Sequence, residues 1–326
     1  MKKLFFVLIF FLPQFVFSKT ISENKSQSLF HYLLYERYFS QGNYLDGISE
    51  LEKAISLDEN SIFLREEILP IYFDLGDYDK TLKTAKRLLD LTGENFSAYY
   101  YMASVYEIRG DPIKAEEFYR KALKIKPNSA DAYFALGRIY MKKKNYEKAE
   151  ESFKQAVLND PENTFIRLTL ALLYEAQGKF SLALDEYLAI KNITPTPATY
   201  LKIGEIYLKL KKESLAEKAF KEVLKIDSEN LSALLALAGI YEGKNQWDKV
   251  KDTLLQFHIV RDDYPEIELY LGVAYMKLGN FKKAEDFFKR AEELAKDNPY
   301  IYRTLAYICT DAGKFEKALK LSLIHI

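Results

Sequence analysis

Apolar and small side chains recur along this chain with a period of 34 residues. A tyrosine marks the same position in each period, at intervals of 34, 34, 34, 34, 33, 34 and 34 residues: Tyr38, Tyr72, Tyr106, Tyr140, Tyr174, Tyr207, Tyr241 and Tyr275. One further step of 34 residues reaches Cys309. A fixed period of this length is typical of an array that stacks one supersecondary unit, here about nine times.

Each period contains two helical stripes, most clearly in residues 130–163. Leu136 lies four residues before Tyr140, so the two share one face of a helix. After a polar, turn-like stretch at 142–145, a second stripe follows at i, i+4 and i+7: Ala149, Phe153 and Ala156. Pro161 then predicts the end of the second helix. The unit is therefore predicted to be two antiparallel helices.

The same positions recur in the other periods. Small residues stand three before the tyrosine position: Ala103, Gly137, Ala171, Gly204, Ala238, Gly272 and Ala306. Aromatic residues stand thirteen after it: Tyr119, Phe153, Tyr187, Phe220 and Phe288. Turn glycines stand four after it: Gly42, Gly76, Gly110, Gly178, Gly279 and Gly313. Two periods depart from the pattern, the second with Pro70 inside its first helix and the seventh with Val250 and Phe257 at alanine positions.

This combination of period and residues resembles the tetratricopeptide repeat family. The resemblance implies an all-α fold, a right-handed α-solenoid of about nine antiparallel helix-turn-helix units. The predicted array covers residues 28–320, with repeats at 28–61, 62–95, 96–129, 130–163, 164–196, 197–230, 231–264 and 265–298, and an incomplete repeat at 299–320.

The amino terminus has the pattern of a bacterial signal peptide. Lys2 and Lys3 precede an unbroken apolar run at 4–12, and Ser18 stands at the small position of a cleavage site. We expect residues 1–18 to be removed and 19–27 to form a linker, so the protein would be exported to the periplasm or secreted. An uncleaved N-terminal anchor is the alternative.

The carboxyl terminus breaks the pattern, because Ser322 and His325 stand where an aromatic and a small residue are due. Residues 321–326 are also what the transposase adaptor sequence CTGTCTCTTATACACATC encodes in frame. We therefore expect a non-native tail at 321–326 and a native chain that continues. A short natural terminus is the alternative.

The charge balance and the scarcity of reactive side chains limit the function. Lysine plus arginine and aspartate plus glutamate both number 47, so no basic field attracts nucleic acid. The three histidines lie far apart, which argues against a metal site, and Cys309 is read as a small buried residue rather than a reactive thiol. The sequence predicts no catalytic residue, no metal and no cofactor.

Function is therefore expected on the concave surface, which the family lines with its first helices. An apolar row stands six residues before the tyrosine: Phe134, Leu168, Leu201, Leu235 and Leu269. Further candidates stand two before it or one after it: Arg138, Leu172, Glu175, Glu205, Glu242 and Val273. An apolar row of this extent is typical of a binding surface, although helix packing could also shield it. The three glutamates would favour a basic partner.

The predicted function is a non-catalytic scaffold of the bacterial cell envelope that binds a protein or peptide in this groove. No asparagine stands two before the tyrosine, so the clamp that some family members use for a peptide carboxylate is not expected. The alternative is the N-terminal repeat region of a larger, truncated protein for polysaccharide export or secretion, or one with a C-terminal enzyme domain. Membrane association would come only from the N-terminal segment or from such a missing domain.

Overall fold

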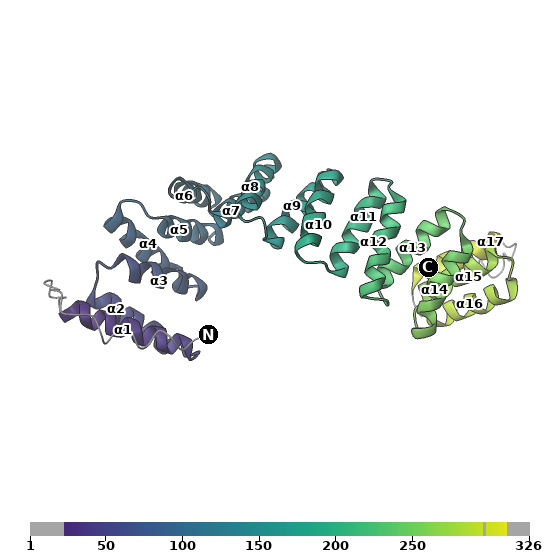
Figure 1. The fold of residues 1–326 in the computed structure, drawn as a ribbon, viewed down its shortest axis with the longest axis horizontal. Coiled ribbons are helices and arrows are strands. Elements are labelled where there is room, and N and C mark those ends of the chain that lie inside the picture. Colours follow the sequence, from purple (N-terminus) through teal and green to yellow (C-terminus); the bar gives the residue numbers. More distant parts are fainter. Residues whose placement is uncertain (1–22, 296–297, 312–326) are drawn as a thin grey trace, which may run out of the picture. The chain divides into compact units, whose positions relative to one another are not determined.

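A computed structural model describes residues 23–295 and 298–311, and this part of the chain consists of helices joined by short turns (Figure 1). The helices of the first half are α1 (Glu23–Ser40), α2 (Tyr44–Leu57), α3 (Ile62–Asp74), α4 (Tyr78–Thr92), α5 (Phe96–Ile108), α6 (Pro112–Ile125), α7 (Ala130–Lys142) and α8 (Tyr146–Asn159). Those of the second half are α9 (Thr164–Ala176), α10 (Phe180–Ile193), α11 (Pro197–Lys209), α12 (Glu213–Ile226), α13 (Leu231–Gly243), α14 (Trp247–Val260), α15 (Pro265–Lys277), α16 (Phe281–Leu294) and α17 (Pro299–Asp311).

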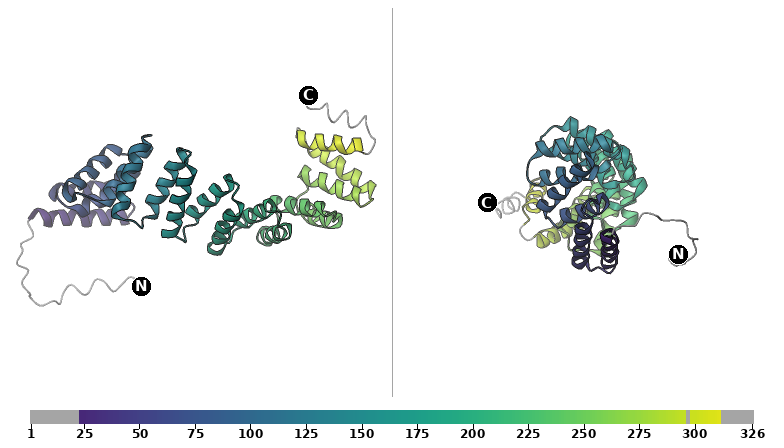
Figure 2. Two further views of the ribbon diagram at one scale, coloured as in Figure 1. Left: turned by 90° about the horizontal axis from the view of Figure 1, so that it is seen from above. Right: turned by 90° about the vertical axis from the view of Figure 1, so that its left-hand side faces the viewer.

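The helices form two compact units, which meet in sequence between Asn159 and Asp160. The first unit contains α1–α8 and the second contains α9–α17. In each unit, odd-numbered and even-numbered helices alternate as the first and second helices of hairpins (Figure 2). The predicted all-α array of repeated helical hairpins is confirmed.

A left-handed residue ends the first helix of each hairpin. It stands four residues after the tyrosine position and is glycine in five hairpins, with φ between 72° and 79°. In the other three hairpins of α1–α16 it is Lys144, Lys211 or Asn245, with φ of 55° to 58°. The next N–H then donates to the backbone carbonyl of the tyrosine itself, over 2.8–2.9 Å in all eight hairpins. This bond belongs to a helix-ending motif that satisfies an otherwise open carbonyl.

Side chains with a short polar group begin most of the helices. Ser61, Asn95, Ser129, Asn163 and Asn230 each accept a hydrogen bond from the backbone N–H three residues later. Such caps satisfy amides at the helix start that have no partner inside the helix. They fix where the first helices α3, α5, α7, α9 and α13 begin.

The core of a hairpin forms where its two helices cross. A Cβ atom added to Gly137, Gly204 or Gly272 would lie 2.4–2.5 Å from the ring of the aromatic residue sixteen positions later. Glycine therefore admits the aromatic ring between the two helices of its own hairpin. In the seventh repeat Val250 and Phe257 are both buried, so larger side chains repack the positions of the missing alanines.

The first helices from α3 to α17 begin at residues 62, 96, 130, 164, 197, 231, 265 and 299, which are the residues where the sequence pattern places repeat starts. The N-terminal boundary differs, because α1 begins at Glu23 and so occupies part of the predicted linker 19–27. Pro70 lies inside α3 without ending it. The predicted signal peptide 1–18, the tail 321–326 and the side chain of Cys309 lie outside what the structure describes. None of the helices in the described ranges is both long and apolar enough to span a bilayer.

Candidate functional site

The predicted apolar row lies on the first helices, and its second-unit part is only partly covered. Leu168 and Leu172, both on α9, are 39% and 49% exposed. Leu201 on α11 and Leu235 on α13 are half-buried and pack against the core that contains Leu237. Leu168, Leu201 and Leu235 stand at matching positions of successive first helices, and together with Leu172 they are called the leucine surface below. The leucine surface is most exposed on α9, whereas its residues on α11 and α13 pack against the core.

Leu269 does not belong to this surface, although the sequence pattern places it in the same row. Its side chain is 2% exposed, because α17 packs against α15 and brings Ile301 and Leu305 into the same cluster. Val273 is half-buried against that cluster. The apolar position is thus used for repeat stacking at this end of the unit.

Two of the three predicted carboxylates already have partners inside the array. Glu175 accepts a hydrogen bond of 2.5 Å from the hydroxyl of Tyr187, and Lys209 Nζ lies 3.6 Å from its second oxygen. Glu205 forms an ion pair of 2.8 Å with Lys202. Of the three, only Glu242 forms no side-chain hydrogen bond or ion pair within the part of the chain that the structure describes. The carboxylates therefore give little support to a basic partner.

Phe134 and Arg138 belong to the first unit, where Arg138 helps to join the third and fourth repeats. The Arg138 guanidinium lies 5.7 Å from the centre of the Phe134 ring and donates to Glu107 of α5 over 3.0 Å. Glu107 is nearly buried and also accepts from Tyr119 over 3.3 Å and from Lys142 over 3.4 Å. Arg138 is therefore a cross-repeat contact as well as an exposed side chain.

Glutamates of several second helices hold the tyrosine of the next repeat, a feature that sequence reasoning missed. The Tyr140 hydroxyl donates to Glu116 over 2.7 Å, and Lys143 forms an ion pair with the same carboxylate over 2.7 Å. Burial alone would raise the pKa of Glu116, but the hydrogen bonds from Lys143 and Tyr140 outweigh it and lower the pKa to about 2.

Glu217 occupies the matching position in the sixth repeat. It accepts from the Tyr241 hydroxyl over 3.0 Å and from Lys221 over 2.8 Å, and Lys244 lies 3.3 Å away. The hydrogen bond from Lys221 is the largest cause that lowers the pKa of Glu217 to about 2. The recurring spacing of glutamate, tyrosine and lysine is the sequence signal that could have identified these contacts.

A buried carboxylate is paired with a histidine between α14 and α15. His258 Nδ1 lies 2.6 Å from Glu268, whose side chain is fully buried, and burial raises the pKa of that carboxyl. Arg290 Nε approaches the second oxygen of Glu268 to 3.7 Å. Within the described ranges, no group of three or more histidine, cysteine or acidic residues is placed to hold a metal ion. The hydrogen bond between His258 and Glu268 links α14 to α15.

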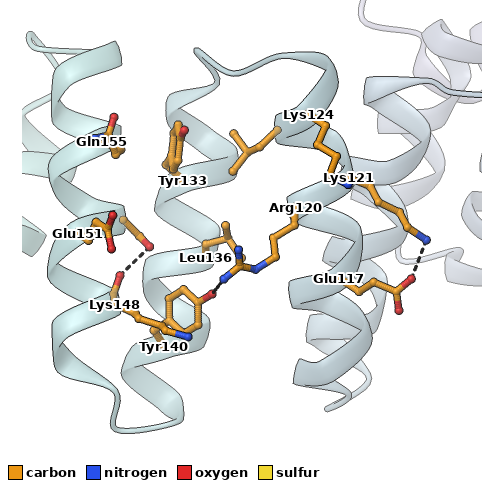
Figure 3. Close-up of a pocket in the computed structure, with 12 residues that line it drawn as sticks. Glu117, Arg120, Lys121, Lys124, Tyr133, Leu136, Tyr140, Lys148, Glu151 and Gln155 are labelled. Carbon is orange, nitrogen blue, oxygen red and sulfur yellow. Dashed lines mark hydrogen bonds and ion pairs between the residues drawn. The ribbon is translucent and has the colours of Figure 1, made fainter.

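A crevice of about 720 Å³ lies between the second helices α6 and α8, with α7 as its floor (Figure 3). The Arg120 guanidinium points toward the Tyr140 hydroxyl and donates to it over 2.6 Å (Figure 3). Lys121 turns away from the crevice and pairs with Glu117 over 2.6 Å. Two of the four cationic side chains that line the crevice, Arg120 and Lys121, are thus bonded to neighbouring residues.

Family comparison finds tetratricopeptide repeats in several parts of the chain. Models of this family match residues 69–130, 108–164, 197–230 and 265–298. Together these segments cover about half of the chain.

Curated relatives and solved structures with similar repeats share little sequence identity with the chain. TPR repeat-containing protein YpiA of Bacillus subtilis (strain 168) is 24% identical over 168 residues, which are 48% of this chain and 38% of the relative. BBSome complex member BBS4 of Bos taurus is 25% identical over 46% of this chain and 29% of the relative, and anaphase-promoting complex subunit 6 of Arabidopsis thaliana is 22% identical over 42% and 26%. The chain spans about a third of the length of the curated relatives it matches.

Two solved structures have comparable helical arrays. PilW, described as a widely conserved type IV pilus biogenesis factor, has a TM-score of 0.49 at 16% identity, over 64% of this chain and 98% of PilW. YrrB, described as a TPR protein with an unusual peptide-binding site, has a TM-score of 0.46 at 19% identity, over 57% of this chain and 96% of YrrB.

Proposed function

The chain belongs to the tetratricopeptide repeat family, and on this premise we propose that it is a non-catalytic scaffold of the bacterial cell envelope. Repeats of this family generally mediate protein or peptide binding. The proposed binding site is the leucine surface, and the proposed partner is a protein or peptide segment with apolar side chains. Two of the relatives are, by name, members of multiprotein complexes, which supports the scaffold role.

The observation that carries this proposal is the exposure of Leu168 and Leu172 on a first helix. Leu168 stands at a position that continues to Leu201 and Leu235 in the next two repeats, and Leu172 lies one helical turn after Leu168 on the same face of α9. Covering a leucine side chain would contribute about 1.5–3 kcal/mol at most, so four leucines form a sufficient base for specific binding. The paired state of Glu175 and Glu205 leaves apolar contact as the main expected source of affinity.

The envelope location rests on the N-terminal sequence, with Lys2 and Lys3 before an apolar run of nine residues. We expect the mature protein to begin after Ser18 and to leave the cytoplasm. Mass spectrometry of the protein purified from an envelope fraction measures this directly. A full-length N-terminus in the cytoplasmic fraction would contradict export.

The binding proposal is tested with a double substitution, Leu168→Asp and Leu172→Asp. Because both leucines are substantially exposed, we expect the helical content and the unfolding midpoint to remain near those of the wild type. Crosslinking and pull-down from envelope fractions should then lose the partner that the wild type retains.

The matched control is Leu182→Asp with Leu215→Asp. These leucines are 42% and 39% exposed but lie on the second helices α10 and α12 of the same unit. The control variant should bind the partner as the wild type does. If the Leu168 and Leu172 variant keeps full binding, or if both variants lose it equally, the leucine surface is not the binding site.

A further inference from the structure

A second crevice lies between the second helices α2 and α4 of the first unit, with α3 as its floor. Its volume is about 660 Å³. Ile55, Ile68 and Tyr72 supply its apolar lining, and Thr84 supplies a hydroxyl. It occupies the same place between repeats one and two as the crevice of Figure 3 does between repeats three and four.

Cationic side chains dominate this crevice. Five of them line it, against two acidic ones: Arg65, Lys80, Lys83, Lys86 and Arg87, with Glu59 and Asp90. Because a low-dielectric crevice concentrates the field of its charges, such an excess attracts anions.

Most of these cations have no carboxylate partner. Lys80 is the exception, since its Nζ lies 2.9 Å from Glu52. Arg65 donates to the backbone carbonyl of Glu59 over 2.6 Å, and Arg87 donates to the side-chain oxygen of Asn60 over 2.9 Å. Lys83 and Lys86 are exposed and form no ion pair within the part of the chain that the structure describes.

The two guanidinium groups of the crevice also repel each other. Burial lowers the pKa of Arg65, and the nearby charge of Arg87 lowers it further. Like charges held close together without a carboxylate between them are stabilised when an anion binds.

The crevice between α6 and α8 provides an internal comparison. There Arg120 pairs with Glu116 and Lys121 pairs with Glu117. Carboxylates thus pair with two of the four cations of this crevice, against one of the five cations of the crevice between α2 and α4.

We propose that the crevice between α2 and α4 binds an acidic segment of a partner protein. Several carboxylates of that segment would contact the cations of the crevice. Lys83 and Arg87 stand one helical turn apart, and Lys80 stands one turn earlier, so the cations form a line along α4. A line of cations fits a chain with spaced single charges better than one compact anion. Glu59 and Asp90 also disfavour a dianionic group such as phosphate.

This site lies on second helices of the first unit, so it does not depend on the leucine surface. The test measures binding of the full chain to a fluorescein-labelled peptide of four Glu-Ser pairs, with a Gln-Ser peptide as the uncharged probe. The variant Lys83→Gln, Lys86→Gln, Arg87→Gln removes three of the five cations of the crevice, two of them from the line along α4. We expect it to bind the acidic peptide about tenfold more weakly than the wild type.

The matched control removes three positive charges from the other crevice: Lys121→Gln, Lys124→Gln and Lys148→Gln. It should keep nearly all of the binding, although both triple variants change the net charge equally. A second variant, Arg87→Lys, keeps the charge and should bind nearly as the wild type does. Circular dichroism melting checks that each variant is folded.

Several results would overturn the proposal. These are an absence of binding to the acidic peptide, equal losses in both triple variants, and equal binding of the Gln-Ser peptide. Displacement of the peptide by inorganic phosphate or by oligothymidylate at the same concentration of charge would assign the crevice to phosphate groups instead and would equally reject the acidic segment.

Discussion

At the scale of single residues, the hairpins solve one packing problem in two ways. Where the aromatic residue of the second helix is phenylalanine, the residue facing it is glycine, as with Phe153 and Gly137. Where it is tyrosine, the first helix has alanine instead, as in the repeats of Tyr119 and Tyr187. The buried tyrosine hydroxyl then needs an acceptor, which Glu175 provides for Tyr187. The aromatic residue, the small residue that faces it and the acceptor for a tyrosine hydroxyl therefore vary together from hairpin to hairpin.

The glycine solution makes a prediction for Gly137→Ala. The new Cβ atom would stand 2.4 Å from the buried Phe153 ring, so the ring or the helices must shift. We expect the free energy of unfolding to fall by about 1–3 kcal/mol, as for other overpacked cores. Urea unfolding followed by circular dichroism measures it.

Gly239→Ala is the control for this substitution. Gly239 lies inside α13, and an added Cβ would meet no atom within 4 Å. Because alanine is the better helix former, we expect a gain of about 0.5–1 kcal/mol. Equal effects of the two substitutions would reject the packing explanation.

At the scale of helices, the sequence predicted the hairpins well because their signals are local. Apolar stripes, capping side chains and turn glycines act over one or two turns, so the first helices start at the expected residues. The contacts between hairpins were not predicted, because they join residues more than twenty positions apart, as with Glu116 and Tyr140. Glu116 gains Tyr140 and Lys143 as partners only when the next hairpin packs against its own. For the same reason Leu269 was expected at the surface and is buried.

These contacts between hairpins predict how stability depends on pH. Glu116 and Glu217 have pKa values of about 2 in the folded protein, below the ordinary value of 4.5. Their stabilising effect is therefore fully present above pH 4.5 and is lost as the pH falls toward 2. The double variant Glu116→Gln, Glu217→Gln should be less stable at pH 7 by roughly 1.5–3 kcal/mol per site. It should also lose less stability than the wild type between pH 4.5 and pH 2.

The control for this pH experiment uses glutamates in exposed ion pairs of single helices. Glu117 pairs with Lys121, and Glu222 pairs with Lys225. Such pairs contribute little, so Glu117→Gln with Glu222→Gln should leave the pH profile of urea unfolding close to that of the wild type. Identical profiles for the two double variants would show that Glu116 and Glu217 contribute no more to the pH dependence of stability than exposed glutamates do.

At the scale of the whole molecule, a tandem array has no single core that joins all of its parts. The chain divides into two compact units, and within each unit the hairpins pack on their neighbours in sequence. The 34-residue period predicts the number and kind of repeats, but it carries no information on this division. In such arrays stability is approximately a sum of repeat and neighbour contributions, so a local change should remain local.

Hydrogen exchange tests this locality with the Gly137→Ala variant. The substitution weakens the hairpin of α7 and α8, and α6 packs against α7, so deuterium uptake should rise in α6, α7 and α8. The helices α15 and α16 belong to the other unit and should exchange as in the wild type. Gly239→Ala supplies the opposite change. We expect slower exchange in α13 and α14 and an unchanged rate of exchange in α7. A uniform rise across all helices in Gly137→Ala would mean that the chain unfolds as one cooperative body, because only then does a local loss of stability open every repeat equally.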